Sequence, residues 1–186
     1  MNIVIHQELL NLNLDILAKT GIKKSTVNKL HKLKAKKLCD LANLEFTQLE
    51  QLLKEDTELN IEQLSKLCSL DLKEFTFSVF DSLKNDPVYE IILLHINNHT
   101  HQEIAQKFGI SKEKVKQKLN EFLQSLFTLV DAIGNKLIAN KPYIGIEELE
   151  EILPEEDKYK LLVLAFRTHN TKWLYHNEAE CFTKTK

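Results

Sequence analysis

The clearest periodic pattern of apolar and polar positions lies between residues 112 and 126. Val115, Leu119, Phe122 and Leu126 are spaced by four, three and four residues, so they form one apolar stripe on a helix. The positions between them are polar and mostly charged. An amphipathic helix buries its apolar stripe and leaves its other side in water. The pattern therefore predicts a helix with one exposed, charged face.

A shorter helix is predicted directly before it. Thr100 is a good N-cap, and Glu103 can return a hydrogen bond to the backbone N–H of that cap. Gly109 supplies the sharp turn that follows, where a positive φ is often required. Ser111 can then cap the longer helix. Two capped helices joined by a tight turn predict a helix-turn-helix.

The polar face of the longer helix carries residue types that can contact DNA. Lysines neutralise phosphates, and long polar side chains reach base edges in the major groove. Glu113 and Gln117 lie one turn apart, and we expect them to contact bases, since Glu accepts from cytosine N4 and Gln pairs with adenine. An ordinary helical hairpin within an all-α protein is the alternative interpretation. The predicted DNA contacts here are Thr100, Ser111, Lys112, Glu113, Lys114, Lys116, Gln117, Lys118 and Asn120.

The stretch from Thr100 to Gln117, THQEIAQKFGISKEKVKQ, resembles the promoter-reading domain (region 4) of bacterial sigma factors. That family's motif runs roughly T-x-x-E-I-[GA]-x-x-[FL]-G-[IV]-[ST]-R-E-R-V-R-Q. Each arginine of the motif is a lysine in this chain, which keeps the charge but loses the bidentate fork that reads guanine. The resemblance covers residues 100–126. It implies a DNA-binding protein whose partners include double-stranded DNA and RNA polymerase or another transcription protein.

The N-terminal part of the chain is predicted to form short, leucine-rich helices. Its stretch STVNKLHKLKAKKLCDLANLEFTQLEQLL resembles the C-terminal domain of the bacterial RNA polymerase alpha subunit, with Leu30, Leu38 and Leu41 at that family's core spacing. The family binds DNA and activators through helix-hairpin-helix elements. The resemblance places Asn28 at a DNA-contacting asparagine and Ser25 at a minor-groove arginine. It implies a secondary DNA contact at Lys23, Lys24, Ser25 and Asn28.

Charge is unevenly distributed along a chain whose net charge is only −2. Residues 16–39 contain eight lysines and no acid, whereas residues 142–157 contain seven acids and no lysine or arginine. The lysine-rich stretch can bind phosphate in a salt-sensitive way. A solvated basic face of a small helical domain explains it equally well.

The last part of the chain predicts a short strand at residues 143–144, helices at 146–153 and 154–168, and a β-hairpin around residues 176–178. Helix, strand, two helices and hairpin is the order of a winged helix. The helix that enters the groove in that fold would here begin Pro154-Glu155-Glu156-Asp157. Three acids disfavour DNA at this position and favour a contact with protein, or none.

Together these patterns predict a mostly all-α fold in four parts. Residues 1–70 form a helical domain with helix-hairpin-helix elements, and residues 71–85 form a connector. Residues 86–139 form the sigma-like helix-turn-helix, with a long last helix because the apolar stripe continues past Leu126 to Leu137. Residues 140–186 form a small acidic segment that ends in the hairpin.

The sequence lacks the motifs that are typical of several classes of enzyme and metal site. The sequence contains no glycine-rich phosphate loop, nucleophile elbow or metalloprotease motif, so we expect no enzyme, no cofactor and no small-molecule substrate. The histidines at positions 95, 99 and 101 are joined by no Cys or acid at ligand spacing except Glu103, so no metal is expected. The three cysteines form no C-x-x-C motif and are expected to be buried thiols in a reducing compartment.

No signal sequence or membrane-spanning apolar run is apparent, and a cytoplasmic protein is expected. Its leading predicted function is DNA binding related to bacterial transcription, through the major-groove helix of the helix-turn-helix. The alternative is a protein-interaction or regulatory module, either by itself or as the N-terminal part of a larger protein, that retains the helix-turn-helix as a scaffold.

Overall fold

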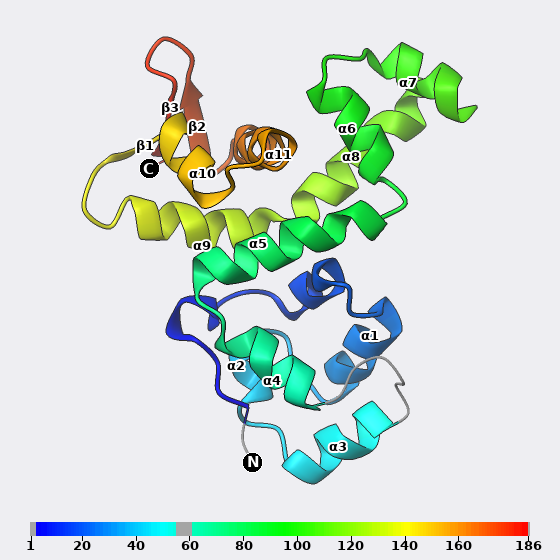
Figure 1. Ribbon diagram of the computed structural model, residues 1–186, viewed down its shortest axis with the longest axis vertical. Helices are drawn as coiled ribbons and strands as arrows, with labels where there is room; N and C mark the ends of the chain where they lie inside the picture. The colour runs from blue at the N-terminus through cyan, green and yellow to red at the C-terminus, as the bar shows by residue number, and fades with distance from the viewer. Residues whose placement is uncertain (1–2, 55–60, 186) are drawn as a thin grey trace. The chain divides into compact units, whose positions relative to one another are not determined.

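The computed structural model describes residues 3–54 and 61–185 and is mostly helical, with a three-stranded antiparallel sheet near the C-terminus (Figure 1). The prediction of a mostly α-helical fold with a short β-hairpin is confirmed. The chain divides into two compact units, residues 1–83 and 84–186. Their boundary falls within residues 71–85, where a connector was predicted, but most of that stretch is a helix of the first unit.

The first unit is a succession of short helices. Two 3-10 helices, η1 (Gln7–Leu9) and η2 (Leu14–Thr20), precede the α-helices, and a third, η3 (Leu83–Asn85), follows them at the boundary between the units. The α-helices are α1 (Lys24–Lys32), α2 (Leu38–Leu41), α3 (Phe46–Lys54), α4 (Ile61–Ser69) and α5 (Leu72–Ser82).

The core of the first unit forms around η2 and α5. Helix α5 is capped at Asp71, whose carboxylate accepts from the Glu74 N–H at 2.8 Å, and it buries Phe75, Val79 and Phe80. These three positions recur at helical spacing, so they present one apolar face to η2, which α5 contacts. Most of residues 71–85 therefore belongs to the core of the first unit and is not a free linker.

A histidine fixes the loop that follows α1. The His31 imidazole bridges the Asp15 carboxylate and the Ala35 carbonyl oxygen, with both contacts at 2.8 Å. The hydrogen bond to Asp15 raises the pKa of His31 above its usual value. Backbone bonds from Leu14 N–H to Lys36 O and from Leu38 N–H to Leu12 O complete the link between η2 and this loop.

The three cysteines differ in burial. Cys68 is fully buried in α4, and burial raises the pKa of its thiol to about 12. Cys39 and Cys181 are partly exposed free thiols. The prediction of three buried thiols is therefore wrong for Cys39, which lies in the four-residue helix α2, and for Cys181, which begins the strand of residues 181–184.

The second unit contains the helix-turn-helix and the sheet. Its elements are α6 (Tyr89–Ile96), α7 (His101–Phe108), α8 (Lys112–Ser125), α9 (Phe127–Leu137), β1 (Tyr143–Gly145), α10 (Ile146–Ile152), α11 (Glu156–Thr168), β2 (Trp173–His176) and β3 (Cys181–Lys184). The sheet order is β1-β3-β2, and both outer strands run antiparallel to β3. The predicted strand, two helices and hairpin are all present.

The predicted long helix is interrupted. Helix α8 ends at Ser125 and α9 begins at Phe127, with Leu126 between them at φ −93°, ψ −7°. The Leu126 N–H bonds three residues back, to Leu123 O, rather than four. Leu126 is fully buried, so its side chain holds the interruption in the core. The expectation of one continuous helix is wrong here, because the apolar stripe runs through the break without a glycine or proline to mark it.

The core below the sheet is built around Trp173. Its indole lies so close to α9 that a Cβ on Gly134 would come within 2.2 Å of the ring. The indole N–H donates to Asp131 at 3.1 Å, and the same carboxylate pairs with Lys172 at 2.7 Å. Phe166 of α11 packs edge-on against the indole. These contacts join α9, α11 and β2 into one core.

Helix α11 is covered on more than one side. It contacts α6, α8 and α9 and buries Leu161, Leu162 and Phe166. Near its start, the Lys158 side chain is buried and pairs with Glu155 at 2.6 Å. Burial raises the pKa of Tyr89 on α6, and the nearby Asp157 carboxylate adds to that effect. The acidic end of α11 therefore lies beside α6.

Candidate nucleic-acid interface

The turn between α7 and α8 has the predicted geometry. The Thr100 N–H donates to Glu103 Oε2 at 2.7 Å, and the Glu103 N–H donates back to Thr100 Oγ1 at 3.3 Å. Gly109 adopts φ +62°, the left-handed conformation that favours glycine. Ser111 Oγ accepts from the Lys114 N–H at 3.1 Å and caps α8. Both predicted caps and the predicted glycine turn are confirmed.

Three helices pack around the turn. Ile92 of α6, Ile104 of α7 and Val115 of α8 are all buried. An ion pair of 2.8 Å between Glu90 and Lys107 also links α6 to α7. Helix α6 begins at Tyr89, and Asp86, Pro87 and Val88 form a bend and turn directly before it. Figure 1 shows these three helices grouped together in the second unit.

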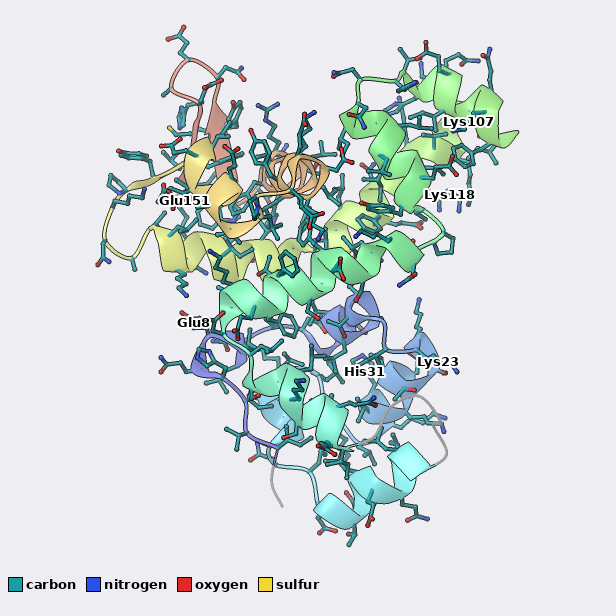
Figure 2. All side chains as sticks on the ribbon, viewed as in Figure 1. Glu8, Lys23, His31, Lys107, Lys118 and Glu151 are labelled. Atoms are coloured by element: carbon teal, nitrogen blue, oxygen red, sulfur yellow. The ribbon has the colours of Figure 1, made fainter. Side chains whose placement is uncertain are left out.

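The predicted contacts on α8 are on the surface. Eight of the nine residues predicted for the helix-turn-helix, which include Thr100 at the start of α7, are exposed: Thr100, Ser111, Lys112, Glu113, Lys114, Lys116, Gln117 and Asn120. Lys118 is partly buried, and it is labelled on α8 in Figure 2 together with Lys107 on α7. Helical spacing puts Glu113 and Gln117 opposite the buried stripe, with lysines flanking them on both sides. The surface thus offers cations around two polar side chains.

The Gln117 side chain already has partners along its own helix. Its amide oxygen accepts from Lys114 Nζ at 3.1 Å, and its amide nitrogen donates to Glu121 at 2.7 Å. Both bonds are exposed, so a base edge could replace them at little cost. Glu121 was not among the predicted contacts. Its spacing of four residues from Gln117 is the signal that could have identified it.

A pair of histidines lies next to this face. The rings of His95 on α6 and His101 on α7 stack with centroids 5.0 Å apart and planes at 29°. Burial lowers the pKa of both, and the ammonium groups of Lys116 and Lys112 lower the pKa of His101 further. The stacking was not predicted from the sequence, since the two histidines are separated by a helix end and a turn in which Asn98 has a positive φ.

The predicted secondary contact lies in the first unit. Lys23, Lys24, Ser25 and Asn28 are all exposed around the first turns of α1. Thr26 and Val27, between them, are buried. Figure 2 labels Lys23 near the start of this helix and His31 near its end. Lys24, Ser25 and Asn28 therefore share one face of α1, and Lys23 is the N-cap that precedes them.

Within residues 3–54 and 61–185 no three His, Cys, Asp or Glu side chains come together as a set of metal ligands. None of the helices described there is both long enough and apolar enough to cross a membrane.

The chain is similar to an uncharacterized protein from Mycoplasma genitalium, with 31% identity over 81 residues, which cover 44% of this chain and 47% of that protein. The match thus spans about half the length of the curated relative. No protein-family model matches the chain, and no solved structure matches it.

Proposed function

We propose that this protein binds duplex DNA through the helix-turn-helix of α7 and α8, with α8 in the major groove, and that it acts with the bacterial transcription machinery. The observation that carries the proposal is the exposed face of α8, where lysines surround Glu113 and Gln117. Lysines on both flanks suit the two phosphate strands that border a groove, while the central pair suits base edges.

The packing of the second unit supports this assignment of roles. Helices α7 and α8 meet at the turn of Gly109, and α6 and α11 pack behind α8. The face that carries Gln117 remains exposed. A rigid support behind an exposed reading helix fixes the position of its side chains relative to the groove.

The C-terminal part of the unit is proposed to be a winged-helix-like scaffold. Strand β1 follows α9, and it pairs with β3 of the hairpin after two helices, as in a winged helix. Its would-be groove helix, α11, begins with acids and contacts α6 and α8. We assign it to support of the helix-turn-helix and not to DNA contact.

The test measures duplex binding across a salt series, with the fluorescence anisotropy of a labelled DNA as the readout. The variant is Lys112→Glu/Lys116→Glu, and the matched control is Lys66→Glu/Lys73→Glu, which makes the same change in net charge at exposed positions of the first unit. Each lysine–phosphate contact contributes about 0.9 to the slope of log K against log salt. We expect the α8 variant to flatten that slope by roughly two and the control to leave it nearly unchanged.

Equal losses in both variants would show that only net charge matters. Absence of duplex binding by the wild-type protein at low salt would overturn the proposal. The second unit would then serve as a protein-interaction module, which two exposed apolar side chains on its sheet favour: Tyr143 is 47% exposed and Leu174 is 50% exposed. Purified RNA polymerase is the first partner to test in that case.

A further inference from the structure

The two stacked histidines form a feature that the predicted DNA contacts leave unused. His95 closes the last turn of α6 and His101 opens α7, so their rings meet where the two helices join. The Nε2 atom of His101 is buried and has no hydrogen-bond partner among the described residues. A buried polar atom without a partner is uncommon and calls for an explanation, such as a ligand.

The charges around the pair are mostly positive. On α8, the ammonium groups of Lys112 and Lys116 are near enough to lower the pKa of His101. The acids of α6 and α7 are engaged elsewhere: Glu90 pairs with Lys107, and Glu103 binds the backbone and hydroxyl of Thr100. His99 lies between the two histidines in sequence. Its ring contacts Leu94 O at 3.2 Å, and its charge contributes to the lowered pKa of Glu103. On α11, the charged residues that face α6 are Glu155, Asp157 and Lys158. Their charges affect the pKa of Tyr89, which lies at the opposite end of α6 from His95.

We infer that His95, His101, Lys112 and Lys116 form a binding site for a backbone phosphate of duplex DNA, and that filling this site takes up a proton at the histidine pair. The inference rests on the proposed function. The site lies at the start of α7, where the helix dipole also favours an anion. The backbone N–H groups of Thr100 and Glu103 are already taken by the capping box, so the dipole is a secondary contribution. The site combines three elements: two imidazoles, two ammonium groups and a helix N-terminus.

The sign of the pH dependence follows from the environment of the rings. In the free protein, burial favours neutral imidazoles at both positions, and the neighbouring lysines add to this at His101, so both pKa values lie below the usual value for histidine. A phosphate favours the imidazolium, so it raises the pKa in the complex. DNA affinity therefore rises as the pH falls through the pKa of the complex, and it levels off below the pKa of the free protein. One proton taken up corresponds to about tenfold in affinity per pH unit in that window.

The experiment measures duplex affinity by fluorescence anisotropy at fixed ionic strength, between about pH 8 and about pH 5.5, the range in which histidine titrates. The variants are His95→Gln and His101→Gln. His176→Gln is the matched control, because His176 lies in β2 and contacts Thr183 at 2.8 Å. We expect the wild type and the control to gain affinity as the pH falls, and the His101 variant to lose most of that gain.

A second measurement does not depend on a variant that must fold. The pKa of His101 in the wild-type protein is followed by NMR alone, with duplex DNA, and with inorganic phosphate at the same ionic strength. The expected result is a pKa that rises with DNA and stays nearly constant with inorganic phosphate. An equal rise with inorganic phosphate would show a site for free anions and overturn the assignment to a DNA phosphate.

The outcomes separate this inference from the proposed function. Duplex binding with the same pH dependence in His101→Gln and the wild type, or an unchanged pKa of His101 in the complex, overturns the inference and leaves the proposed function standing. No duplex binding by the wild type at any pH overturns the proposed function, and the inference with it.

Discussion

Helices α8 and α11 occupy similar positions in their helix pairs, but their first turns carry charges of opposite sign. Each is a long helix that follows a shorter helix and a brief connection, α7 before α8 and α10 before α11. The first turn of α8 includes Lys112 and Lys114, and it is capped by Ser111. The first turn of α11 carries Glu156 and Asp157, and its N-cap, Glu155, makes no side-chain cap bond.

Burial explains the difference between the two helices. Helix α8 buries one stripe, whereas α11 also buries Val163 and the side chain of Lys158. A helix buried on several sides has little free surface to place in a groove, whatever its charge. A helix-turn-helix-like connection therefore does not by itself identify a helix that enters a DNA groove. The exposed face and the sign of its charge are what distinguish α8 from α11.

The largest expected effect concerns the stability of the core that contains α11. Trp173→Ala removes a fully buried indole that packs on Gly134 and Phe166 and donates to Asp131. Truncation of a buried tryptophan costs about 3–5 kcal/mol in the free energy of unfolding. We expect a loss of this size, measured by thermal and urea unfolding of the whole chain followed by circular dichroism.

Leu174→Ala is the neighbouring control. Leu174 is 50% exposed on the same strand, so its truncation is expected to cost within about 0.5 kcal/mol. Similar losses for the two variants would mean that the core below the sheet does not support α11 as described. Duplex affinity of the folded fraction should change little in Leu174→Ala.

The next effect concerns base reading. Gln117→Ala removes an exposed amide at the centre of the α8 face, and a bidentate contact to a base contributes about 1–3 kcal/mol to discrimination. We expect the variant to lose roughly tenfold or more in preference between the selected and unselected duplexes, with stability nearly unchanged. Selection of duplexes from a random library by the wild type, followed by competition binding, provides the measurement.

Asp157→Ala makes the same kind of truncation at the start of α11. Because α11 is assigned to support, this variant should leave the preference among duplexes unchanged. A loss of preference in Asp157→Ala, or none in Gln117→Ala, would reverse the roles assigned to the two helices.

The sequence predicted what depends on neighbouring residues. The capping box of Thr100, the turn at Gly109 and the cap at Ser111 need only a few adjacent side chains, so they could be identified without a fold. The hairpin was predicted for the same reason, from two apolar strands around a polar turn. Such signals are encoded locally and survive in the structure.

What the sequence did not predict depends on long-range packing. The interruption at Leu126 leaves no local mark, because the residue is as apolar as the stripe around it. The contact of α11 with α6, and the stacking of His95 on His101, each require a tertiary arrangement that periodicity does not encode. The candidate DNA face could be predicted since exposure follows from periodicity, whereas its histidine neighbours could not.

The smallest expected effect tests the cap that distinguishes α8 from α11. Ser111→Ala removes the hydroxyl that accepts from the Lys114 N–H, and loss of a serine cap costs about 1 kcal/mol. Ser111→Gly should cost only a few tenths of that, because glycine is itself an acceptable N-cap. Circular dichroism unfolding of the three proteins measures both losses. Equal costs for the alanine and glycine variants would show that the hydroxyl acts other than as a cap. A loss of duplex affinity in both variants at unchanged stability would instead make Ser111 a phosphate contact, because a hydroxyl that contacts DNA matters to binding and not to the isolated helix.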